Sequence, residues 1–101
     1  MDILSELQNN KIIFFTFMRE KYPLFSKSNL FLRDLQYAIM TYFEKKEVKV
    51  KYGPAEKIAL QFAEYLEKQN ELTRLGKFTW KVNFSLDSGV KEETKAVEAV
   101  N

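Results

Sequence analysis

The chain has 101 residues, of which 46% are hydrophobic and 15% aromatic, and its formal net charge is +2. This length and apolar content predict one globular domain with a modest core, and they exclude an intrinsically disordered chain. The chain holds no Cys and no His, which excludes disulfides, zinc sites of the Cys/His kind and histidine-based acid–base catalysis.

Residues 2–22 are predicted to form a first helix, because apolar residues recur at helical spacing and Pro23 disfavours helix in the residue before it. The apolar stripe consists of Ile3, Leu7, Phe14, Met18 and Tyr22. Further apolar residues spread around the remaining circumference, at Ile12, Ile13, Phe15 and Phe17. A helix that is apolar on all sides is expected to be buried on all sides, either by the domain or by a second molecule. The alternative is a break at residues 9 and 10, followed by a strand over residues 11–17.

A second helix is predicted after Ser28, which can cap its first turn. Its core-facing stripe consists of Phe31, Leu32, Leu35, Ala38, Ile39, Tyr42 and Phe43. Leu30, Tyr37 and Met40 fall together outside this stripe, which indicates a contact surface or the place where the first helix packs. Residues 47–51 alternate as EVKVK and predict a short strand.

A third helix is predicted to start at Gly53 as N-cap, with Pro54 at the first helical position and a stop near Asn70. Its apolar stripe consists of Ala55, Ile58, Ala59, Phe62, Ala63 and Leu66. The pair Gly76 and Lys77 then predicts a tight turn.

The segment after this turn, FTWKVNF over residues 78–84, alternates like a half-buried strand. Its predicted core face carries Phe78, Trp80, Val82 and Phe84. A two-residue loop would place Leu75 opposite Phe78, whereas an odd-length loop would place Leu72 on the Trp80 face. We favour the second register, because it buries more apolar surface.

The order of a helix, a short strand, a tight turn and an aromatic strand over residues 51–84 resembles the C-terminal half of a winged-helix domain. This resemblance implies that the helix is the recognition helix and the hairpin is the wing. We therefore predict an α+β fold with three helices and a C-terminal β-hairpin wing over residues 1–85, followed by a flexible tail over residues 86–101. One feature departs from the family. Its first strand usually lies between helices one and two, whereas the short strand predicted here, residues 47–51, lies between helices two and three.

The leading functional prediction is non-enzymatic nucleic-acid binding, to double-stranded DNA, by a transcription or replication accessory protein. Phosphate contacts are predicted for basic residues of the wing and of the loop before the third helix, namely Arg74, Lys77, Lys81, Lys49 and Lys51, with Lys45 and Lys46 nearby. On the outward face of the third helix, Lys57 and Gln61 are placed for base contacts.

The alternative is a winged-helix protein-interaction subunit of a larger assembly. The outward face of the third helix carries three acidic residues against two basic ones, and a net negative face is disfavoured near phosphates. Leu60 on this face suits a protein groove better than DNA, and so does the face with Leu30, Tyr37 and Met40. A continuous positive groove beside the wing would favour DNA, and an apolar patch there would favour a protein.

The remaining predictions concern chemistry, location and assembly. The sequence contains no nucleophile–base pair and no glycine-rich phosphate loop, so we expect no enzyme activity, cofactor or metal. It shows no membrane span and no secretory leader, so the expected compartment is the cytoplasm, and its many Lys and Glu residues are typical of a thermophilic source. The apolar flank of the first helix predicts a homodimer with Ile13 and Phe17 at its interface.

Overall fold

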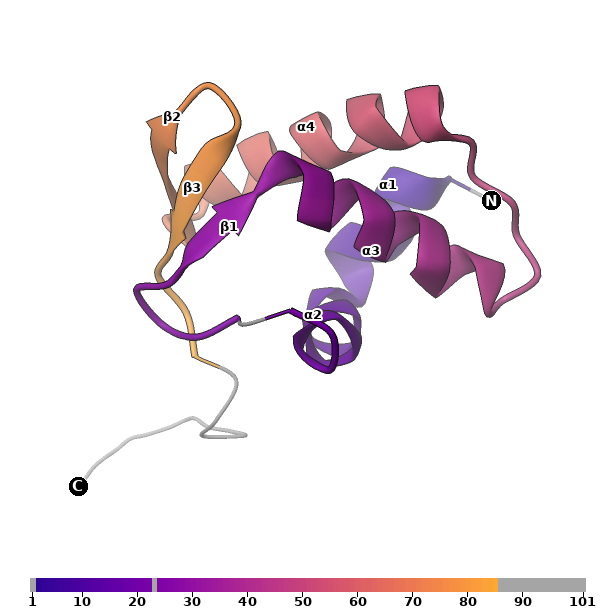
Figure 1. The fold of residues 1–101 in the computed structure, drawn as a ribbon, viewed down its shortest axis with the longest axis horizontal. Helices are drawn as coiled ribbons and strands as arrows, with labels where there is room; N and C mark the ends of the chain where they lie inside the picture. The colour runs from indigo at the N-terminus through magenta and orange to yellow at the C-terminus, as the bar shows by residue number, and fades with distance from the viewer. Residues whose placement is uncertain (1, 23, 86–101) are drawn as a thin grey trace.

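The structure is a computed structural model that describes residues 2–22 and 24–85, and the tail predicted over residues 86–101 lies outside the described residues. Within the described ranges the fold is α+β, with four helices and one three-stranded antiparallel sheet (Figure 1). The helices are α1 (Ile3–Asn9), α2 (Lys11–Arg19), α3 (Leu32–Glu44) and α4 (Tyr52–Lys68). The strands are β1 (Asn29–Phe31), β2 (Leu72–Gly76) and β3 (Thr79–Val82). No helix in these ranges combines the length and the apolar content that crossing a membrane requires.

The single first helix that we predicted is two helices, because the backbone breaks at Asn10, with φ −126° and ψ 35°. The side-chain Nδ2 of Asn10 donates to the Glu6 carbonyl at 3.2 Å and closes the end of α1. The break predicted in the alternative is thus present, but residues 11–17 are helical, so the strand that was to follow it is wrong. The domain itself does not cover this helix on all sides, because Ile12 and Ile13 are each 60% exposed.

The sheet has the strand order β1-β3-β2, and its first strand was not predicted. Leu30 of β1 lies opposite Trp80 of β3, and both side chains are buried. Because residues 29–31 are extended, α3 begins at Leu32 and not after Ser28. The Ser28 hydroxyl instead donates to the Phe25 carbonyl at 2.6 Å and closes a turn before β1. Phe31, predicted for the core, is exposed as a result.

The strand predicted over residues 47–51 is wrong, because this segment is a turn followed by an irregular connection between α3 and α4. Glu47 has a φ of 63°, and the amide of Val48 donates to the Phe43 carbonyl at 2.8 Å. The turn therefore reverses the chain where a strand would have to stay extended. Only Val50 of this alternating segment is buried.

The hairpin places Leu72 opposite Val82 and on the buried face with Trp80, as we favoured, but its turn has two residues and not an odd number. A bulge between Arg74 and Gly76 leaves Leu75 as the extra, exposed residue. The two-residue turn is therefore shifted by one position, to residues 77 and 78.

Helix α4 carries the centre of the core and begins at Tyr52, just before the predicted start. Its buried residues are Ala55, Ala59, Phe62, Ala63 and Leu66, as predicted, whereas Ile58 is only partly buried. The ring of Phe62 packs edge-on against Phe14 at 5.9 Å and stacks on Phe15 at 5.7 Å. The core thus joins α2 and α4, and β3 closes it through Trp80 and Val82.

Candidate functional site: an aromatic groove beside the hairpin

Arg74, a predicted phosphate contact, is held inside the hairpin by an acidic residue of α4. The Glu67 Oε2 atom accepts hydrogen bonds from Trp80 Nε1 at 2.8 Å and from Arg74 Nη2 at 3.0 Å. The guanidinium group lies over the Trp80 ring at 5.1 Å, and Arg74 Nη1 also donates to the Lys77 carbonyl at 2.9 Å. Arg74 therefore fastens the hairpin to the C-terminal end of α4, and its charge is already paired.

The other basic residues predicted for one positive face lie in two separate places. Lys77 is exposed in the hairpin turn, and Lys81 lies on β3 opposite Asn29 and Thr73. Lys49 and Lys51 belong to the connection between α3 and α4, at the other end of the long axis from the hairpin (Figure 1). The structure therefore does not bring the predicted basic loop and the wing together.

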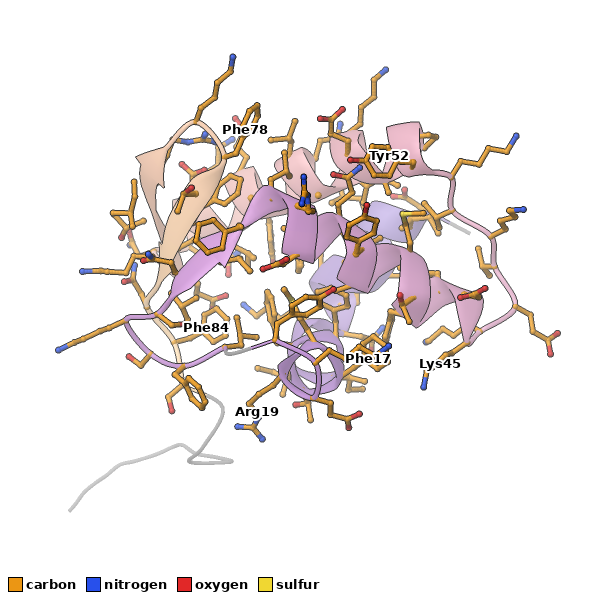
Figure 2. The ribbon with its side chains drawn as sticks, in the orientation of Figure 1. Phe17, Arg19, Lys45, Tyr52, Phe78 and Phe84 are labelled. Atoms are coloured by element: carbon orange, nitrogen blue, oxygen red, sulfur yellow. The ribbon has the colours of Figure 1, made fainter. Side chains whose placement is uncertain are left out.

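The two remaining basic residues of that loop, Lys45 and Lys46, contact residues of α1 and α2. The Lys46 ammonium donates to a Glu6 carboxylate oxygen at 3.0 Å, and this hydrogen bond raises the pKa of Lys46. Lys45 lies over the Phe17 ring at 5.4 Å, and Figure 2 shows this pair on the opposite side of α3 from Phe78 and Tyr52. Both lysines face α1 or α2 and not the hairpin.

An open groove of about 390 Å³ lies beside the hairpin turn, and we refer to it as the aromatic groove. It is formed by the start of α3, the start of α4 and the hairpin turn. Its lining residues are Phe31, Leu32, Arg33, Gln36, Tyr52, Glu56, Phe78 and Thr79.

Exposed aromatic rings surround this groove. Phe31 and Phe78 are each 47% exposed and Tyr52 is 53% exposed, while Tyr37, 41% exposed, lies next to Tyr52 with the ring centroids 6.0 Å apart. Phe31 reaches this place because it ends an edge strand, and Phe78 because the bulge moves it into the turn. The amide of Leu32 donates to the Phe78 carbonyl at 2.9 Å, so the two phenylalanines are held beside each other.

The polar groups of the groove include one buried amide, one charge on each wall and the hydroxyl-bearing side chains of Tyr52 and Thr79. Gln36 is only 2% exposed, and its Nε2 donates to the Tyr52 carbonyl at 3.0 Å. Arg33 stands on the α3 wall and Glu56 on the α4 wall, and both are exposed. Neither forms an ion pair with any residue in the described ranges. Lys57 and Gln61, predicted for base contacts, are exposed further along α4.

The predicted face of Leu30, Tyr37 and Met40 does not exist as one surface. Leu30 is a buried residue of β1, opposite Trp80, so its assignment to an interface is wrong. Tyr37 is exposed and lies beside Tyr52 at the margin of the aromatic groove. Met40 is partly buried and lines a second hollow near the end of α3. Leu60, predicted on the outward face of α4, is partly buried against the core.

The predicted dimer flank is open at one residue and partly covered at the other. Ile13 is exposed beside Ile12, whereas the Phe17 ring packs edge-on against Tyr42 of α3 at 5.5 Å. The exposed apolar surface of α2 therefore consists of the two isoleucines.

Sequence reasoning missed Phe31, Gln36 and Tyr52 as site residues and placed Phe78 in the core. Phe31 and Phe78 come to the groove only through the pairing of β1 with β3 and the bulge in β2. One local signal was present, since Tyr52 directly precedes the Gly-Pro pair that marks a helix start.

Comparison with known proteins assigns no family to this geometry, because no family model matches the chain and neither curated proteins nor solved structures give a significant match.

Proposed function

We propose that this chain is a winged-helix-like protein-interaction domain and that a partner protein docks in the aromatic groove. The observation that carries the proposal is the gathering of exposed aromatic side chains at one groove, which Phe31, Tyr52 and Phe78 line and which Tyr37 adjoins through Tyr52. Aromatic residues and Arg are enriched in the cores of protein interfaces, where Lys and Glu are depleted. An apolar surface beside the hairpin is also the feature that distinguishes a protein partner from DNA.

The order of elements supports the winged-helix part of the proposal. Strand β1 lies between α2 and α3 and pairs with β3, which is where the family has its first strand if α1 and α2 correspond to its first helix. Helix α4 then corresponds to the recognition helix, and the hairpin of β2 and β3 to the wing. The aromatic groove adjoins both of these elements.

The charges support a protein partner over duplex DNA. A DNA-binding face is expected to carry several unpaired cations, because each one that neutralises a phosphate releases a counterion and adds affinity. Here Arg74 is paired with Glu67. Lys49 and Lys51 lie before the start of α4, whereas the hairpin follows its end. Glu56 also lines the groove, where it would repel phosphate.

The first prediction is that the full chain, used as bait, enriches binders from a displayed library of short random peptides. Replacing Phe31 and Phe78 together by Ala is expected to weaken the enriched peptides by at least about tenfold, because both rings lose their contact area. Both side chains are about half exposed, so the fold should be retained. Affinities are measured by fluorescence anisotropy. The matched control replaces Ile12 and Ile13 by Ala, which removes exposed apolar surface from α2 and should leave affinity unchanged.

The contrary outcome is binding to DNA. Random-sequence duplex DNA is titrated with the same protein at increasing salt, for wild type and for Lys77→Glu with Lys81→Glu. Duplex binding that is uniformly weakened by these changes, with a salt slope smaller by about two units, would replace the protein-interaction proposal by DNA binding through the wing.

The second prediction is a homodimer through α2, at the exposed pair Ile12 and Ile13. A two-fold interface places the same apolar surface on both copies, so one substitution brings two negative charges into the interface. We expect Ile13→Glu to convert a wild-type dimer into a monomer in light scattering coupled to size exclusion. Gln61→Glu, at an exposed position of α4, serves as a control for the charge change. A monomeric wild type, or a mutant that stays dimeric, would contradict the prediction.

A further inference from the structure

Gln36 is the one buried polar side chain among the residues that the structure describes, and it lines the aromatic groove. Its hydrogen bond to the Tyr52 carbonyl fixes the orientation of the amide, because only the NH₂ group can donate to a carbonyl. The Oε1 atom receives no hydrogen bond from any residue in the described ranges. A buried acceptor without a donor is unfavourable, so a bound group that supplies an N–H or O–H is favoured at this position.

The walls around this amide are suited to a large apolar side chain. The hollow of about 390 Å³ falls within the size range of binding pockets, which is roughly 300–1,000 Å³, and its lining mixes aromatic rings with polar and charged side chains. Phe31, Phe78 and Tyr52 contribute aromatic rings to its lining. Their side chains come from three different elements, so a ligand in the groove would contact β1, the hairpin and α4 together.

The charges at the groove indicate the class of ligand. Arg33 and Lys77 stand on the side of α3 and the hairpin, whereas Glu56 stands on the side of α4. A nucleic acid has a negative charge at every nucleotide and would meet Glu56. A peptide can place an acidic residue toward Arg33 and Lys77 and a neutral or basic residue toward Glu56. Charge complementarity thus favours a peptide.

Building on the proposed function, we propose that the partner binds through a peptide segment with three features. A large apolar side chain enters the aromatic groove, the backbone N–H next to it donates to Gln36 Oε1, and an acidic side chain of the segment faces Arg33. Gln36 is then the residue that fixes the register of the peptide, while the aromatic rings supply most of the contact area.

The test uses the strongest peptide from the displayed library and a series of its variants, each methylated at one backbone nitrogen. N-methylation removes one N–H donor, so one position next to the apolar residue should lose about tenfold or more in affinity for the wild-type protein. With Gln36→Met, which keeps the length of the side chain but offers no strong acceptor, the unmethylated peptide should bind about tenfold more weakly. Methylation at that position should then have little further effect. Gln61→Met, the same change at an exposed position of α4, is the matched control.

Arg33→Glu tests the charge part of the proposal and should weaken acidic peptides about fivefold at low salt, an effect that high salt removes. Lys45→Glu, at the far end of the molecule, is its control and should have no effect. A measurement on the wild type alone guards against misfolding of Gln36→Met: the side-chain amide resonances of ¹⁵N-labelled Gln36 should shift when the peptide is added.

The outcomes separate this inference from the proposed function. A library that gives no peptide dependent on Phe31 and Phe78 would overturn both. Peptides that depend on those rings, but whose N-methyl pattern is the same for wild type and Gln36→Met, would overturn the inference and leave the protein-interaction function intact. A single-stranded DNA oligonucleotide that displaces the peptide and binds more tightly would overturn the choice of a peptide as ligand.

Discussion

Replacing Phe62 by Ala is expected to lower the free energy of unfolding by about 3–5 kcal/mol. The side chain is fully buried, and its ring contacts Phe14, Phe15 and Tyr65. The loss would combine the transfer of the ring out of the core with the cavity that remains. Small domains are stable by only about 5–15 kcal/mol, so much of the protein would unfold at moderate temperature.

Urea unfolding followed by far-ultraviolet circular dichroism measures this effect. Gln61→Ala, one residue earlier on the exposed face of α4, is the matched control and should change stability by less than about 0.5 kcal/mol. A loss below about 1 kcal/mol for Phe62→Ala would contradict the core position of this ring.

Replacing Trp80 by Ala is expected to have an effect of similar size, about 3–5 kcal/mol, because the fully buried indole fills the space between β3 and α4. Trp80→Phe keeps most of the packing but removes the N–H that donates to Glu67, and should cost roughly 1–3 kcal/mol. The difference between the two variants therefore separates packing from the hydrogen bond. Unfolding in urea again provides the measurement.

The control for both variants is Phe78→Ala, in the turn of the same hairpin, which should leave stability nearly unchanged because the ring is about half exposed. Equal losses for Trp80→Ala and Trp80→Phe would show that the hydrogen bond to Glu67, and not the volume of the ring, attaches the hairpin to α4.

The parts of the fold that follow a local pattern could be predicted. The buried stripe of α4 repeats at helical spacing, and Leu72, Trp80 and Val82 alternate, so both follow from residues close in sequence. Strand β1 could not be found this way. Its partner β3 is about 50 residues away, and Leu30 and Phe31 are spaced equally well for the start of a helix. The pairing with Trp80 decides between the two structures.

The candidate site was harder to predict, for two physical reasons. The basic residues flank α4 in the sequence, but a helix of 17 residues is about 25 Å long and keeps its ends apart. The aromatic groove depends on the bulge at Leu75, which moves Phe78 from the core face into the turn. No local pattern fixes the position of a bulge, because it depends on the register between two strands.

The contacts of Trp80 make this residue an internal optical probe. It is the only tryptophan in the chain, and its indole ring lies between a carboxylate hydrogen bond and a guanidinium group. Indole emission responds to nearby charge, and Trp80 is only two residues from Phe78 in the aromatic groove. A ligand that moves the hairpin turn would change the position of Arg74 over the ring. Fluorescence of the unlabelled protein can therefore report events in the groove without an added dye.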